Sequence, residues 1–329
     1  MNFLTHIFYR YNVQPIIDPH VVQYVVGIMN EKNAQLGKPA FGTIFIFKLP
    51  ELFINIPNAM AVKDNTARQF LYLTSTTLDI LEHLVCDPEA QTYTLTCIAP
   101  RSPYTMKVVL TKKPAERMMR ALIEHELGHL YHPHHCRKYA PVVLVKASIG
   151  LITAWIGVYY YFVSHASPFF IHGITIDWPL FLMGFGMYYA LAYFIQLTNS
   201  SFTSSKNWEQ EADEFIANDP KILHGMILFQ EIMLQAQTYI YSYSNWWIKF
   251  HAWWKWMDCA EFVRQNRVAA HKYFERSSPL GEAYHPMPEE RIGRFKERIG
   301  QLTAENMPEI EPISIIIYHG TRIVQKYTA

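Results

Sequence analysis

The spacing of apolar and polar residues predicts both helices and strands in the N-terminal third of the chain. Residues 18–36 place an apolar residue at every third or fourth position after Asp18, a good N-cap, so we expect a helix there. Residues 41–74 instead contain short β-rich runs that are separated by Pro50 and Pro57, a pattern typical of a small sheet.

A longer helix is predicted to begin near Pro114, because proline is tolerated in the first turn of a helix. Met118 and Leu122 then share one face of this helix with His125 and His129. The remaining pattern predicts a helix at 76–85, two strands within 93–111, helices at 206–217, 220–241 and 287–300, and a strand near the C-terminus.

Two apolar runs stand out in the middle of the chain, at residues 141–163 and 178–197. The first contains a single charge, Lys146, and the second contains none. Each is long enough to cross a hydrocarbon core of about 30 Å at about 1.5 Å per residue, and both have aromatic residues toward their ends. We therefore expect a transmembrane hairpin, with two buried helices of a soluble protein as the alternative.

The charges that flank this hairpin predict its orientation. The connecting loop contains no lysine or arginine, whereas Arg137 and Lys138 precede the first run and Lys206 follows the second. The positive-inside rule then places residues 1–140 and 199–329 on the cytoplasmic side, as two parts of one catalytic domain around the hairpin at 141–198. No signal peptide is apparent, so we expect an integral protein of a bacterial inner membrane, or else of the endoplasmic reticulum.

Residues 245–258 contain five tryptophans, at a density that is unusual for a globular domain. Such a segment fits a helix that lies at the lipid headgroups. It equally fits a tryptophan-rich core or the packing surface of a lid, and the sequence leaves this choice open.

Composition and charge narrow the range of partners. Half of the residues are hydrophobic and only 17% are charged, against about 25% in an average soluble protein. The formal net charge of +1 gives no electrostatic reason to expect binding to nucleic acid. The four cysteines form no CxxC pair and suggest no disulfide framework in a chain of this length.

The segment IEHELGHL at 123–130 contains an HExxH motif. Positions four apart lie on one face of a helix, so His125 and His129 can bind one ion, and Glu126 can reach a water on that ion. Zinc lowers the pKa of such a water toward 7 and a glutamate can then take its proton. Gly128 costs about 1 kcal/mol relative to alanine inside a helix, which predicts close packing at this point, against a strand or the substrate.

A catalytic zinc site requires a third protein ligand besides an open position. The extended HExxHxxGxxH pattern is absent, and His132 in the run HPHH is better explained as a solvated residue next to the membrane. Glu209 and Asp213 lie four apart on a second predicted helix, where Glu209 can coordinate and Asp213 can bond to a histidine ligand. The alternative is a solvated acidic face.

These features together resemble a known family. The HELGH helix, two long apolar runs and the ExxxD pattern in EQEADEFIA are similar to those of the integral-membrane zinc metallopeptidases that include HtpX and the CAAX prenyl endopeptidases. PNAMAV at 57–62 resembles the Asn-Ala strand of that family, and HPMPEERI at 285–292 resembles its HPxxxxR element. The resemblance implies an α+β, mainly helical, zincin-like domain with a small N-terminal sheet and a transmembrane hairpin inserted between the zinc-binding helices.

The resemblance also implies a zinc centre with one Zn²⁺ per chain. His125, His129 and Glu209 would be its ligands, and Glu126 would be the general base and later the proton donor. Asp213 would bond to a histidine ligand and would not coordinate the zinc itself.

Four further residues would act on the substrate or stabilise the site. His285 would lie near the developing oxyanion, and Arg291 would steady the carboxylates or that histidine. Asn58 and Ala59 would help to form an edge strand on which an extended peptide can pair through main-chain hydrogen bonds.

The sequence therefore predicts a membrane-anchored zinc endopeptidase that acts on membrane or membrane-proximal polypeptides, including misfolded ones. Its partners would be a polypeptide substrate and the lipid bilayer, and not nucleic acid. Two alternatives remain open: a non-proteolytic membrane-bound scaffold or regulatory protein that binds zinc, and a soluble zinc hydrolase in which the helices of 141–197 form a core.

Overall fold

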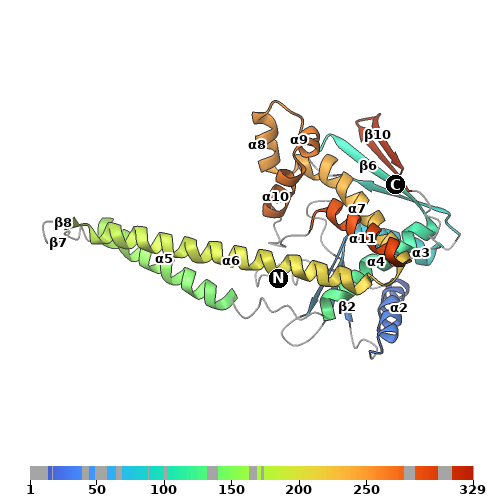
Figure 1. Ribbon diagram of the computed structural model, residues 1–329, viewed down its shortest axis with the longest axis horizontal. Coiled ribbons are helices and arrows are strands. Elements are labelled where there is room, and N and C mark those ends of the chain that lie inside the picture. Colours follow the sequence, from blue (N-terminus) through green and yellow to red (C-terminus); the bar gives the residue numbers. More distant parts are fainter. Residues whose placement is uncertain are drawn as a thin grey trace. The chain divides into compact units, whose positions relative to one another are not determined.

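The fold is mainly helical with small sheets, as seen in a computed structural model of the chain (Figure 1). The chain divides into two compact units, of which unit 1 contains Met1–His132 and Trp208–Ala329 and unit 2 contains Pro133–Asn207. The structure describes residues 14–16, 18–38, 44–48, 58–63, 69–87, 89–98, 102–131, 140–162, 169–171, 174–277, 286–302 and 313–328.

The first sheet of unit 1 has the strand order β1-β2-β4-β3. Strand β2 runs parallel to β4, and β3 runs antiparallel to β4 with Ala59 opposite Leu73 and Ala61 opposite Leu71. This is the small sheet that the sequence predicts within 41–74, and β3 lies at the edge of its described part. Its strands are β1 (Gln14–Pro15), β2 (Ile44–Lys48), β3 (Ala59–Lys63) and β4 (Gln69–Leu73).

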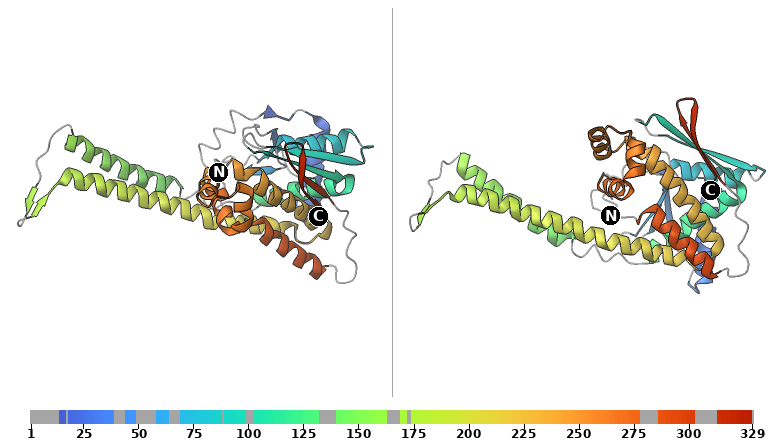
Figure 2. Two further views of the ribbon diagram at one scale, coloured as in Figure 1. Left: turned by 90° about the horizontal axis from the view of Figure 1, so that it is seen from above. Right: turned by 45° about the horizontal axis from the view of Figure 1, so that its top comes forward.

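The second sheet of unit 1 has the order β10-β9-β6-β5 and is antiparallel throughout. The sequence predicts β5, β6 and β9, but it predicts neither β10 nor the pairing of β6 with β9, a strand far along the chain. Figure 2 shows the β9–β10 hairpin alongside β6. The strands are β5 (Thr92–Cys97), β6 (Tyr104–Thr111), β9 (Ser314–His319) and β10 (Arg322–Thr328).

Helices make up most of the rest of unit 1. At the start of α2, the side chain of Asp18 accepts hydrogen bonds from the backbone N–H groups of His20 and Val21, as expected of the predicted N-cap. Helix α7 packs against both α4 and α11 (Figure 1). The helices are α2 (Pro19–Gln35), α3 (Ser75–Cys86), α4 (Lys112–Tyr131), α7 (Pro220–Tyr239), α8 (Trp246–Trp254), α9 (Cys259–Gln265), α10 (Arg267–Ser277) and α11 (Pro288–Leu302), with a 3₁₀ turn at Tyr241–Tyr243.

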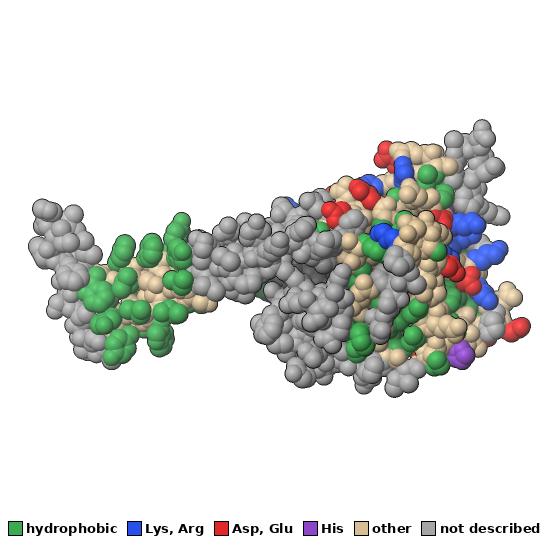
Figure 3. All heavy atoms as spheres, turned by 90° about the horizontal axis from the view of Figure 1, so that it is seen from below, with side chains coloured by type: hydrophobic (Ala, Val, Ile, Leu, Met, Phe, Trp, Pro, Cys, Tyr) green, Lys and Arg blue, Asp and Glu red, His purple; other side chains and the backbone are tan. Residues whose placement is uncertain are grey.

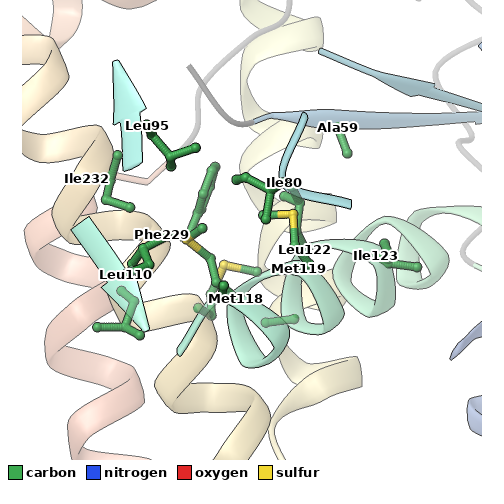
Figure 4. Packing of buried hydrophobic residues seen from close by; sticks show 14 of the residues in the cluster. Ala59, Ile80, Leu95, Leu110, Met118, Met119, Leu122, Ile123, Phe229 and Ile232 are labelled. Carbon is green, nitrogen blue, oxygen red and sulfur yellow. The ribbon is translucent and has the colours of Figure 1, made fainter. Parts of the chain in front are cut away.

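The core of unit 1 is built around α4. Met118, Met119 and Leu122 are fully or almost fully buried on this helix. Figure 4 shows them among side chains from α3, α7 and the second sheet. Burial of each such side chain contributes about 1.5–3 kcal/mol. Because α4 is packed from several sides, the histidines that follow in its next turns are held in a fixed position.

Unit 2 contains α5 (Ala140–Phe162), the short strands β7 (Phe169–Ile171) and β8 (Ile174–Ile176), and the first part of α6 (Trp178–Ile216). Helix α6 is a single helix of 39 residues that continues into unit 1. The prediction of separate helices at 178–197 and 206–217 was therefore wrong. The polar segment SSFTSSKN at 200–207 interrupts the apolar pattern and so suggested a break between two helices. It contains neither glycine nor proline, so nothing in it prevents one helix from continuing through it.

The predicted transmembrane hairpin is contradicted by the structure. Among the described residues, no helix combines the length and the apolar character needed to cross a bilayer. This finding covers the described residues, and some side chains of the runs at 141–163 and 178–197 lie outside that part of the chain. The predicted location in a bacterial inner membrane is not tested by this finding and stays a prediction.

Unit 2 nevertheless exposes many apolar side chains. Figure 3 shows hydrophobic side chains over much of its visible, described surface. They include Ile152 and Trp155 on α5 and Phe181 on α6. Between these helices, a Cβ on Gly186 would lie 2.4 Å from the backbone nitrogen of Ala154, so the two backbones approach closely where the side chain is absent.

The crossing of α4 and α7 generates a stability prediction. A Cβ on Gly225 would lie 2.1 Å from the carbonyl oxygen of Arg117, so Gly225→Ala must push the two helices apart. We expect the free energy of unfolding to fall by about 2 kcal/mol or more, although alanine is the better helix former.

Gly293→Ala is the matched control, because Gly293 is helical and exposed, and a Cβ added there would meet nothing within 4 Å. This variant should gain about 0.5–1 kcal/mol from helix propensity. Urea denaturation of both variants measures the difference, and equal effects would show that the α4–α7 crossing is not tight.

Candidate metal centre

Helix α4 carries the two histidines of the site on one face. The His125 and His129 rings are 4.9 Å apart between centroids and nearly perpendicular. Donor atoms of His125, Glu126 and His129 all lie within 4.8 Å of one another. His125 and Glu126 are buried, so these three side chains form a group that can hold a metal ion in a largely enclosed position.

Glu209, near the C-terminal end of α6, brings a carboxylate to both rings. Its Oε2 lies 3.2 Å from Nε2 of His125, and its Oε1 lies 3.3 Å from Nε2 of His129. Donor atoms that are about 2.0–2.1 Å from a tetrahedral zinc ion lie about 3.3–3.4 Å from one another. Each of the two separations from Glu209 is compatible with this value, so Glu209 is placed to join the histidines at one metal ion.

Asp213, one turn further along α6, lies behind His125. Its Oδ1 is 3.2 Å from Nδ1 of His125, which leaves Nε2 of the same ring facing Glu209. A carboxylate in this position fixes the orientation of a histidine ring and raises its basicity.

Arg291 on α11 holds Asp213 in place. Its Nε donates to Oδ2 of Asp213 at 3.0 Å, and its Nη2 donates to Oδ1, so the guanidinium and the carboxylate form a two-pronged pair. Nη1 of Arg291 also lies 3.5 Å from Oε2 of Glu209. Arg294, one turn along α11, donates to Asp213 at 3.2 Å. The family resemblance indicated Arg291 but not Arg294, whose position on the same helical face was the available signal.

Electrostatic interactions shift the pKa values of this cluster in different directions. Burial raises the pKa of Glu126, and the nearby histidines only partly oppose this effect. Burial also raises the pKa of Asp213, but Arg291 and His125 outweigh it and hold the pKa below its ordinary value. For His125, burial lowers the pKa, yet Asp213 and Glu209 outweigh it and raise the pKa to about 9.

The balance of buried charge also fits a cation. Glu126, Glu209 and Asp213 are three buried carboxyl groups, and Arg291 is a buried cation beside them. Buried charges are costly unless they are paired. A divalent ion among these carboxylates would neutralise the excess, and a proton on His125 does so in part when no metal is bound.

Strand β3 reaches the site through a main-chain hydrogen bond. The backbone N–H of Ala61 donates to Oε2 of Glu126 at 2.6 Å. Ala61 was not identified from the sequence, although it lies two residues after Ala59 and so on the same side of the strand. This bond lowers the pKa of Glu126 and fixes the direction of its carboxylate.

Gly128 is packed as tightly as its position in the motif predicts. A Cβ there would lie 3.0 Å from Cα of Ala212 and 3.2 Å from Cβ of Phe215. The partner is therefore α6, the helix that carries Glu209, and not a strand or a substrate. The missing side chain lets α4 and α6 approach until Glu209 reaches both histidines.

Asn58 immediately precedes β3, and its polar groups bond within the chain. Its N–H donates to Oγ1 of Thr77 at 2.8 Å, and its carbonyl accepts from the N–H of Thr74 at 3.0 Å. Its side-chain oxygen accepts from the N–H of Ala59. Asn58 thus ties β3 to the start of α3, and the part of the edge strand nearest Glu126 is at Ala61.

Two of the sequence-based assignments concern residues outside the described part of the chain. These are His285, predicted near the oxyanion, and His132, the weaker candidate for a metal ligand. No family model, curated protein or solved structure matches this chain. The family resemblance and the identity of the metal therefore remain predictions.

The distances from Glu209 predict a large effect of its replacement. Glu209→Gln should weaken metal binding by more than about 100-fold, because a neutral amide replaces a charged ligand. Competition with a chelating dye measures the affinity. Glu214→Gln is the matched control, since Glu214 is exposed on the same helix and its loss should leave the affinity unchanged. Equal affinities of the two variants would remove Glu209 from the ligand set.

The pKa of His125 predicts that metal binding releases a proton. With a pKa of about 9, His125 is protonated in the metal-free protein at pH 7 and must lose this proton to coordinate through Nε2. Affinity should therefore rise with pH until about pH 9, by up to tenfold per pH unit. The same proton stabilises the metal-free fold fully below about pH 6.5, and this stabilisation is lost as the pH rises through about 9.

Titration calorimetry of metal binding, repeated in buffers of different ionisation enthalpy, measures how many protons the protein releases for each metal ion that it binds. About one proton from His125 should be released per metal ion at pH 7 and almost none at pH 10. An affinity that stays flat between pH 7 and pH 9 would contradict this assignment.

Proposed function

We propose that this protein is a zinc-dependent endopeptidase in which His125, His129 and Glu209 hold one zinc ion. The observation that carries the proposal is the pair of distances from the Glu209 carboxylate to the two imidazoles, which fit zinc coordination. The adjacent Glu126 supplies the base that a hydrolase needs, and the HELGH and ExxxD patterns support the same assignment.

A zinc ion in this position would lower the pKa of a bound water toward 7 and polarise the scissile carbonyl. The chain itself supplies the proton transfers. Glu126, held by the N–H of Ala61, takes the proton from the attacking water and later delivers it to the leaving amine. Its raised pKa suits this double role, because a carboxyl group that titrates closer to neutral pH both accepts and returns a proton readily.

Asp213 and Arg291 support this chemistry without contact with the substrate. Arg291 fixes Asp213, and Asp213 orients the His125 ring, so Nε2 keeps its direction through the reaction. His285 is assigned to oxyanion stabilisation only by the family resemblance, and that role stays a prediction.

The substrate we propose is a polypeptide in extended conformation. Strand β3 lies at the edge of the described sheet. At Ala61 its backbone reaches the site and donates a hydrogen bond to Glu126, the proposed base. An extended peptide can pair with such an edge through main-chain hydrogen bonds. The expectation that substrates lie in or near a membrane is part of the prediction from sequence.

Glu126→Gln tests the proposal directly. The amide is nearly isosteric but cannot act as a base, so we expect cleavage of an unfolded protein such as casein to fall by at least about 100-fold. Zinc content should remain near one ion per chain in both proteins, because Glu126 is not among the proposed ligands. Peptide release is measured for the purified full chain after loading with zinc.

The zinc content of each protein distinguishes the possible outcomes. Cleavage by wild type alone, with equal zinc in both, supports the peptidase and the role of Glu126. If both bind one zinc and neither cleaves casein or a library of extended peptides, the peptidase proposal fails. The protein would then be a zinc-binding scaffold or regulatory protein, the alternative that the sequence left open.

A further inference from the structure

The outer face of α8 exposes a group of large aromatic side chains. Trp246 is 58% exposed, Trp253 65%, Trp254 66% and Trp256, just beyond the helix, 92%. Phe250 is also exposed and lies beside three of these rings. We call these five residues the α8 aromatic face. A tryptophan-rich core, one of the alternatives left open by the sequence, does not describe them.

The opposite face of α8 is anchored in the protein. Ile248 and Ala252 are fully or almost fully buried, and they pack with Phe262 and Val263 of α9 and Ala270 of α10. Asn245 caps the helix by accepting from the N–H of Ile248. The aromatic face is therefore displayed on a small, well-supported group of helices (Figure 1) and is not the exposed side of a loose segment.

The end of α8 holds Trp256 in an unusual backbone conformation. Its φ is +54°, in the left-handed region that a bulky residue rarely adopts. The N–H of Met257 donates to the carbonyl of Ala252 at 2.9 Å, so Trp256 occupies the position that glycine usually fills in such a helix terminus. A tryptophan at this strained position adds nothing to packing, since it is almost completely exposed. Strain of this kind points to a use outside the fold.

The charge and composition of the segment indicate what it contacts. Residues 245–258 contain two lysines, Lys249 and Lys255, and one acidic residue, Asp258, which caps α9 and accepts a hydrogen bond from Tyr243. The outer face is made of tryptophan and phenylalanine, without leucine, isoleucine or valine. Tryptophan concentrates at the headgroup level of membranes, and lysine is attracted to anionic lipids. A groove for a partner helix would instead favour aliphatic residues at heptad spacing.

We propose that the α8 aromatic face docks on the surface of an anionic lipid bilayer, with the indoles at headgroup depth. The helix lies along the surface: at 9 residues, α8 is far too short to cross. This inference goes beyond the proposed peptidase activity and does not depend on it, since lipid binding is measured without zinc turnover or substrate.

Hydrogen exchange of the full chain with and without vesicles locates the contact. Vesicles of phosphatidylcholine alone are compared with vesicles containing about 30% phosphatidylglycerol. We expect slower amide exchange in peptides that cover 246–257 with the anionic vesicles, and a smaller effect with the neutral ones. Protein that sediments with vesicles while these amides exchange unchanged would overturn the proposal, because another surface would then make the contact.

Two sets of variants test the tryptophans themselves. Trp253→Ser with Trp254→Ser should weaken vesicle binding by about tenfold or more, whereas Trp155→Ser on α5, an equally exposed tryptophan, should not. Trp256→Gly should also weaken binding, yet it should raise the melting temperature by about 2 °C because it relieves the left-handed strain.

The Trp256→Gly variant keeps the test valid if the double variant misfolds, since this variant must fold at least as well as wild type. Unchanged vesicle affinity in Trp256→Gly and in a folded double variant would overturn the proposal. So would the loss of a dimer in the same variants by sedimentation velocity without any change in vesicle binding, because a second copy of the chain would then cover the face.

Discussion

The ion pair between Asp213 and Arg291 is the interaction on which the geometry of the metal centre depends. Both side chains are buried, so neither charge can be left without the other except at a cost of several kcal/mol. The pair joins the end of α6 to α11, and Asp213 also contacts His125 on α4. A single carboxylate thus fixes three helices relative to one another and sets the direction of a proposed metal ligand.

Backbone proximity is the second constraint on the site. Gly128 lets α4 approach α6, and Gly225 lets α7 approach α4 so closely that no side chain would fit. The core around Met118, Met119 and Leu122 then fills the space on the other side of α4. Small residues at the crossings and large residues between them together place Glu209 within reach of both histidines.

Unit 1 combines this enclosed site with an open aromatic surface on α8. The site is largely buried and has an edge strand beside its proposed base, which suits an extended chain. The α8 aromatic face suits lipid headgroups. The two proposals together describe an enzyme that would cut extended polypeptides beside a bilayer, although each rests on its own observations and each can fail without the other.

Several features of the protein were determined by local sequence. The HELGH spacing places His125 and His129 on one face of a helix, and the ExxxD spacing places Glu209 and Asp213 on one face of another, because helical periodicity requires it. The caps, the small sheet and most helices of unit 1 follow from equally local signals. The long apolar runs, by contrast, predicted spans that no helix among the described residues provides.

Only the tertiary structure decided how these local elements meet. The bond from Ala61 to Glu126 joins residues that are 65 positions apart, and the pairing of β6 with β9 joins strands that are further apart still. Nothing in a local pattern specifies such contacts. The choice between a tryptophan core and an exposed face on α8 was likewise a matter of packing, since aromatic residues at helical spacing fit both. Sequence periodicity fixes which residues share a face, whereas burial and the pairing of charges fix what that face contacts.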